Sequence, residues 1–171
     1  MSRPSKTRSI AFICPIAAAL VLGAYALAHD EGGETERRVK ESEVPKAALD
    51  ALKDLAGGAA LTEFSEEIEN GATYYEGSWK GTHGNVDALV TPSGDLVELE
   101  EVIPLDSLPK PVLEKARKAA GQDAKLFVEK KTYVMYEVKY RTGDRRHEVV
   151  YSPDGRTHGH EQEEGDDDQD D

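Results

Sequence analysis

Histidines and carboxylates gather near the C-terminal end of the chain, where their types and spacing suit a metal ion. His158, His160 and Glu161 stand close together and run into an acidic segment. Imidazole suits zinc, copper or nickel, and carboxylate oxygens suit calcium and other hard cations. We therefore predict a divalent metal as a candidate ligand and no other cofactor. The alternative is a solvated tail, because flexible ligands lose conformational entropy when they become ordered.

Motifs for catalysis are absent from the sequence. It contains no Gly-x-Ser-x-Gly, no phosphate-binding loop and no His-Glu-x-x-His. Among the histidines, only His147 lies in a well-defined strand pattern, on the side of Val149 and Tyr151, which favours a sheet-edge histidine without catalytic partners. The lone cysteine, Cys14, lies in an N-terminal apolar run. We therefore predict no catalytic residue and no enzymatic activity.

Aromatic side chains on the predicted strands divide into two groups. Tyr74 and Tyr133 fall on the polar sides of their strands, where aromatic residues act as binding anchors. Ordinary cross-strand pairing is the alternative for both. The aromatic residues that we expect in the core are Tyr75, Trp79, Tyr136 and Tyr140.

Charged residues alternate with apolar ones along the same strands and offer a recognition surface. A solvated sheet face is the alternative interpretation, and an open strand edge would also allow a partner peptide to add a strand. The partner-binding residues that we predict are Tyr74, Glu76, Tyr133, Glu137, Lys139 and Arg141.

The N-terminal residues 1–28 have the features of a secretory signal peptide. Arg3, Lys6 and Arg8 precede an uncharged apolar run at residues 10–27, and a small-x-small site ends at Ala28. Cleavage after Ala28 predicts a periplasmic or secreted protein with no stable membrane anchor. A retained membrane anchor is the alternative, because the run approaches the length that spans a bilayer.

The charge of the chain limits its partners. The formal net charge is −13, which opposes binding to nucleic acid or to an anionic membrane. It favours cations, or a protein or peptide partner outside the cytoplasm. Residues 159–171 are rich in Asp and Glu, and such a block predicts an acidic disordered tail.

Between a polar lead-in at residues 29–43 and the tail, one order of elements occurs twice, at residues 44–107 and 108–158. Each copy opens with a helix pattern that starts at a proline and stops at a glycine. Strand-like segments follow, at 60–68, 73–80, 85–91 and 96–103 in the first copy and at 124–131, 133–141 and 145–152 in the second.

The strand segments alternate between apolar and polar residues, most clearly at residues 133–141. This pattern is typical of an antiparallel sheet with one solvated face. We therefore predict an α+β fold of two repeated units, each a helix with an antiparallel β-meander, with the helices packed on one sheet face.

Three short motifs occur in both copies. They are Val44-Pro45 and Leu108-Pro109, Tyr75-Glu76 and Tyr136-Glu137, and Pro92-Ser93-Gly94 and Pro153-Asp154-Gly155. In this order the motifs resemble the PepSY-like family, which is also described as β-lactamase-inhibitor-like. The resemblance implies exported, non-catalytic proteins that act by binding, and a hydrolase or peptidase outside the cytoplasm as the partner.

Overall fold

The computed structural model describes residues 35–163, with side chains described as far as residue 160. The predicted signal peptide at residues 1–28 and residues 164–171 of the predicted tail lie outside this part. No helix within the described residues is long and apolar enough to cross a membrane.

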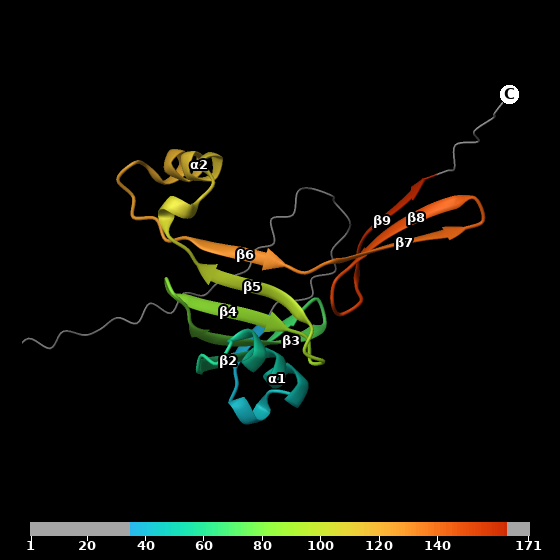
Figure 1. The fold of residues 1–171 in the computed structure, drawn as a ribbon, viewed down its shortest axis with the longest axis horizontal. Helices are drawn as coiled ribbons and strands as arrows, with labels where there is room; N and C mark the ends of the chain where they lie inside the picture. The colour runs from blue at the N-terminus through green and yellow to red at the C-terminus, as the bar shows by residue number, and fades with distance from the viewer. Residues whose placement is uncertain (1–34, 164–171) are drawn as a thin grey trace, which may run out of the picture. The chain divides into compact units, whose positions relative to one another are not determined.

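The described residues form two antiparallel sheets and two α-helices (Figure 1). Neighbouring strands of the six-stranded sheet follow the chain order, and so do those of the three-stranded sheet. The first sheet contains β1 (Thr35–Arg38), β2 (Leu61–Glu69), β3 (Ala72–Lys80), β4 (Asn85–Val90), β5 (Leu96–Val102) and β6 (Glu129–Tyr133). The second contains β7 (Tyr136–Thr142), β8 (Arg145–Tyr151) and β9 (Thr157–Glu163).

Helix α1 (Lys46–Leu55) covers one face of the six-stranded sheet and makes the core. Ala48 and Leu52 are 0% exposed. They pack with Tyr75, Trp79, Ala88 and Val90 of β3 and β4. Gly77 allows the helix to approach β3 closely, because a Cβ atom at this position would lie 3.0 Å from Leu52 Cδ1. The helix predicted at the start of the first copy is thus present.

Helix α2 (Lys110–Ala120) has no buried residue, and Val112 on its apolar side is 48% exposed. The second copy of the predicted repeat is therefore not a helix packed on its own meander. The predicted α+β fold of two such units is wrong: the molecule is a β-rich protein with nine described strands in two antiparallel sheets.

Pairing between β5 and β6 explains the difference. Residues 129–133 align with residues 98–102 of β5, and Lys131 Nζ lies 3.0 Å from Glu98 Oε1 and also binds Glu100. Pairing to β5 ends after Val134, whose backbone N–H donates to Val97. The first strand of the second copy therefore completes the first sheet, and the remaining three strands form a sheet of their own.

Strands also form in two segments that the sequence predicted to be a polar lead-in and an acidic tail. β1 lies within the predicted lead-in and pairs antiparallel with β2. Ion pairs of Arg37 with Glu66 at 2.7 Å and of Arg38 with Glu63 at 2.8 Å also join the two strands. β9 extends into the predicted tail as far as Glu163 because it pairs with β8 from Arg146 to Tyr151. Residues 159–163 are thus part of a sheet.

Candidate functional site

Strand β7 is an edge of the three-stranded sheet, because β8 is its one neighbour among the described strands. All of its residues are exposed. The hairpin to β8 turns at Gly143, which has φ = 63°, and such a positive φ at the first turn residue is typical of a two-residue hairpin. An edge strand offers backbone N–H and C=O groups to a further strand.

The register of this hairpin shows which backbone groups of β7 face outward. Thr142 pairs with Arg145 across the two-residue turn, and the pair next to such a turn exchanges hydrogen bonds. Pairs along an antiparallel ladder alternate between hydrogen-bonded and non-hydrogen-bonded. The backbone N–H of Lys139, which pairs with Glu148, therefore points away from β8.

One side of β7 is apolar and open to solvent. Tyr136 is 52% exposed, and Val138 and Tyr140 are 45% exposed each. The prediction that Tyr136 and Tyr140 belong to the core is wrong, because helix α2 does not pack its apolar side on this sheet. Met135 (42% exposed) and Tyr133 (45% exposed) are further exposed apolar side chains just before β7, and Tyr133 belongs to β6 of the other sheet.

The other side of β7 is charged. The Nζ of Lys139 lies 2.7 Å from Glu137 Oε1 and 2.7 Å from Glu148 Oε1, and hydrogen bonds to these two carboxylates raise the pKa of Lys139. Arg141 is exposed and pairs in register with Arg146. The structure therefore places the predicted residues Glu137, Lys139 and Arg141 together on one accessible face.

An open depression of about 580 Å³ lies at this end of the hairpin. Both strands contribute to its lining, which consists of Lys139, Tyr140, Arg141, Arg146, His147 and Glu148. It offers room for a partner side chain beside cationic groups.

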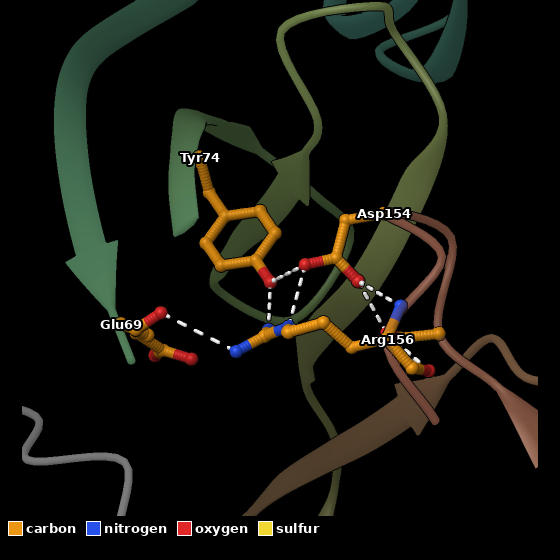
Figure 2. Close-up of polar contacts among 5 residues, drawn as sticks. Glu69, Tyr74, Asp154 and Arg156 are labelled. Carbon is orange, nitrogen blue, oxygen red and sulfur yellow. Dashed lines mark hydrogen bonds and ion pairs between the residues drawn. The ribbon is translucent and has the colours of Figure 1, made fainter. Parts of the chain in front are cut away.

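Tyr74 lies in a different environment from the one predicted for it. It is 1% exposed, and its hydroxyl donates to Asp154 Oδ2 at 2.8 Å and accepts from Arg156 (Figure 2). Burial, and then the hydrogen bond to Asp154, raises the pKa of Tyr74. Tyr74 is therefore a structural contact between β3 and the β8–β9 turn, not an exposed anchor.

Asp154 and Arg156 complete this contact. Arg156 Nε lies 2.6 Å from Asp154 Oδ2, and Arg156 Nη1 donates to the backbone oxygen of Glu69 at 3.4 Å (Figure 2). Burial would raise the pKa of Asp154, but hydrogen bonds from Ser152 and Tyr74 outweigh it and lower that pKa to about 2. Neither residue was predicted as a site residue from the sequence, where Pro153-Asp154-Gly155 served only as one of the repeated motifs.

Glu76 lies on the face of the six-stranded sheet away from α1, among other carboxylates. Its pKa is raised to about 9, by burial first and then by the charges of Glu67, Asp87 and other carboxylates. Tyr133 shares this face through its register with Glu98. Glu76 is half-buried on this sheet, whereas Glu137, Lys139 and Arg141 belong to the other sheet, so the six predicted residues do not form one surface.

The predicted metal residues lie at β9. His158 and His160 are exposed, and the side chain of Glu161 lies outside the described part. The imidazole of His160 contacts His147 of β8, not His158: His160 Nε2 lies 3.3 Å from His147 Nδ1. Within the described side chains, no group of three or more His, Cys, Asp or Glu residues is arranged to hold a metal ion.

Comparison with known proteins gives weak similarities. No family model matches the chain, and no curated protein matches it. One solved structure, of a protein from Bacteroides eggerthii proposed to be periplasmic, is 15% identical, covers 70% of this chain and 88% of its own, and has a TM-score of 0.41.

Two more solved structures come from the same genus. A protein from Bacteroides thetaiotaomicron, proposed to be calcium-regulated and periplasmic, is 14% identical with a TM-score of 0.33. A Bacteroides vulgatus protein of the DUF2874 family, proposed to be periplasmic, is 13% identical with a TM-score of 0.33. Each covers 74% of this chain and 96% of its own. These similarities assign the chain to no family, and the PepSY-like resemblance stays a prediction.

Proposed function

We propose that this chain is an exported, non-catalytic binding module that holds an extended segment of a partner protein or peptide along strand β7. The observation that carries the proposal is that β7 is an edge strand exposed along its whole length, with an apolar row on one side and charged groups on the other. Export follows from the signal peptide predicted at residues 1–28.

Addition of a partner strand would use both the outward backbone groups of β7 and its side chains. Backbone hydrogen bonds to the outward N–H and C=O groups supply affinity, and alternate side chains supply specificity. Tyr136, Val138 and Tyr140 present apolar area that a partner can bury. Large exposed apolar areas of this kind are typical of protein-binding sites.

Charge indicates the kind of segment that fits. The β7–β8 hairpin has a small excess of positive charge in a chain whose formal net charge is −13. Its basic residues are Lys139, Arg141, Arg145 and Arg146, and its acidic residues are Glu137, Asp144 and Glu148. A segment with acidic residues on one side and apolar residues on the other matches both sides of β7. A hydrolase or peptidase outside the cytoplasm is the partner class that the PepSY-like resemblance implies.

The test is a selection followed by a matched pair of variants. A display library of short peptides that alternate apolar and acidic residues is selected on the chain that begins at His29. Fluorescence anisotropy then measures the affinity of the selected peptides. Lys139→Pro removes an outward backbone N–H and leaves the backbone hydrogen bonds to β8 in place. An edge strand tolerates proline at such a position, where the N–H faces solvent. Lys139→Ala is the control, because it removes the same side chain but keeps the N–H.

We expect Lys139→Pro to bind the peptides about tenfold more weakly than Lys139→Ala, while circular dichroism shows both variants folded. Equal binding by the two variants, or a library that yields no peptide, would contradict strand addition at β7.

A further inference from the structure

We propose that the apolar side of the β7–β8 hairpin is a docking surface for helix α2 of a second copy of this chain. The contact lies between chains and leaves the fold of each chain unchanged. It goes beyond the proposed function, because a helix on the apolar side leaves the outward backbone edge of β7 free.

Two apolar surfaces within the described residues have no cover. On the hairpin, Tyr136, Val138 and Tyr140 are between 45% and 52% exposed. On α2, no residue is buried and Val112 is 48% exposed. Ala116 shares the side of Val112, since residues four apart lie on the same side of a helix. Large exposed apolar surfaces are typical of contacts with another protein.

Helix α1 and strand β3 show how the two surfaces fit together. Leu52 packs so closely on Gly77 that a Cβ atom there would lie 3.0 Å from Leu52 Cδ1. Ala116 has the same place in α2 as Leu52 has in α1, and Val138 follows the Tyr-Glu motif of its strand as Gly77 does. The larger side chain is on the helix in the first pair and on the strand in the second. Both pairs contain the same number of side-chain carbon atoms, so α2 matches the hairpin at the density that protein interiors require.

Charge also favours this helix as the occupant. α2 carries four basic residues and one acidic residue, in a chain whose formal net charge is −13. Glu163, the last residue of β9, pairs with Arg146 of the hairpin. The chain therefore enters residues 164–171, which contain six Asp or Glu residues, beside the hairpin. A basic helix on the hairpin brings opposite charges together, which favours it over an acidic partner.

Strand β6 keeps α2 away from the hairpin of its own chain. β6 lies between α2 and β7 in the sequence, and each of its residues pairs with β5. Because a strand rises about 3.3 Å per residue, the step from Glu129 to Tyr136 is roughly 20 Å. A second copy supplies the helix without breaking the pairing of β6. When each copy gives its helix to the other, the dimer has two equal contacts, as in the twofold interfaces common among proteins.

Disulfide cross-linking tests the contact directly, because the chain that begins at His29 contains no cysteine. One chain carries Ala116→Cys and another carries Val138→Cys, and the two are mixed and oxidised. In the control, Lys118→Cys replaces Ala116→Cys, since Lys118 lies on the opposite side of α2. Mass spectrometry identifies the linked positions.

We expect a disulfide between positions 116 and 138 of different chains, and about tenfold less product between positions 118 and 138, because a disulfide forms only where the two Cα atoms come within about 7 Å. A chain that carries both Ala116→Cys and Val138→Cys distinguishes a second copy from the same chain. Dimers joined at these positions agree with the proposal. A disulfide within one chain, or equal cross-linking at positions 116 and 118, would overturn it.

Sedimentation velocity of the parent chain gives a measure that needs no substitution. We expect a monomer at about 1 μM and mostly dimer at about 1 mM, as for a contact of modest affinity. Val112→Asp should remain monomeric at both concentrations, whereas Glu114→Gln on the polar side of α2 should behave as the parent does. Circular dichroism shows whether each variant keeps its fold. A parent chain that is still monomeric at the higher concentration would also overturn the proposal.

Discussion

Among the described residues, Glu76 has a carboxyl group whose pKa lies far above its ordinary value. Glu76 pairs across the sheet with Ser65 of β2 and Leu89 of β4, both of which are buried. Burial and the surrounding carboxylates both favour its neutral form, which is why its pKa rises from 4.5 to about 9. Between these two pH values the folded chain keeps a proton that the unfolded chain has lost, so its contribution to stability falls as the pH rises.

Replacing Glu76 with Gln should remove this dependence. Glu76→Gln keeps the shape of the side chain but carries no charge. We expect it to raise the free energy of unfolding by about 1–3 kcal/mol at pH 8, with little change at pH 5. Urea unfolding at the two pH values measures the difference. Glu114→Gln on exposed α2 is the control, and equal effects of Glu76→Gln at both pH values would contradict the prediction.

In the sequence, Tyr74 and Glu76 each fall on the polar side of the predicted strand, and the structure places both on the face of β3 opposite Tyr75. Their burial was not predictable, because Tyr74 is covered through contacts with Asp154 and Arg156, about eighty residues later in the chain. Alternation along one strand indicates which side chains share a face. It does not indicate what lies over that face.

At the scale of elements, the contact between β3 and the β8–β9 turn joins the two sheets. Asp154 is central to it, since it accepts from Tyr74 and Ser152 and pairs with Arg156. Its lowered pKa means that the folded state favours the carboxylate, so this stability is present above the ordinary pKa of 3.8 and is lost as the pH falls toward about 2.

Asp154→Asn should therefore destabilise the chain by about 1–3 kcal/mol at neutral pH, because it weakens a charged hydrogen-bonded group. The loss should shrink as the pH falls toward 2, where the parent carboxyl also becomes neutral. Thermal unfolding at several pH values measures this. Tyr74→Phe, which keeps Asp154 paired with Arg156, should cost about 1 kcal/mol; a cost for Asp154→Asn that is the same at every pH would contradict the prediction.

The two helices should respond differently to truncation of an apolar side chain. Leu52→Ala in α1 should cost about 2–5 kcal/mol, because Leu52 is fully buried against β3. Val112→Ala in α2 should change the stability by less than about 0.5 kcal/mol, because Val112 is 48% exposed. Urea unfolding of both variants tests the prediction, and a large cost for Val112→Ala would show that α2 packs on a sheet.

Strands and turns were predictable where the types of neighbouring residues determine the backbone conformation. Asn70 and Gly71 both have positive φ at the turn between β2 and β3, as expected for Asn-Gly in a hairpin. The division of the second copy between two sheets was not predictable, since it depends on β6 pairing with β5 through Lys131, Glu98 and Glu100. The two copies therefore have similar sequence patterns but different structures, because strand pairing between residues far apart in the sequence decides which sheet each strand joins.

At the scale of the whole molecule, the excess of negative charge affects the stability of the folded state. The formal net charge of −13 opposes the compact state through repulsion among like charges. The exposed ion pairs that salt would weaken contribute little, about 0–1 kcal/mol each. Screening should therefore remove more repulsion than attraction, so added salt should stabilise this protein.

We expect the melting temperature to rise when sodium chloride is raised from about 0.01 M to about 0.5 M, a range over which the screening length falls from about 30 Å to a few ångströms. Differential scanning calorimetry of the chain that begins at His29 measures the rise. A chain that ends at Glu163 lacks the acidic residues 164–171 and should show a smaller rise. If the melting temperature instead fell with salt, exposed ion pairs such as Arg38 with Glu63 would outweigh the repulsion, and the folded state would depend on these pairs in spite of its net charge.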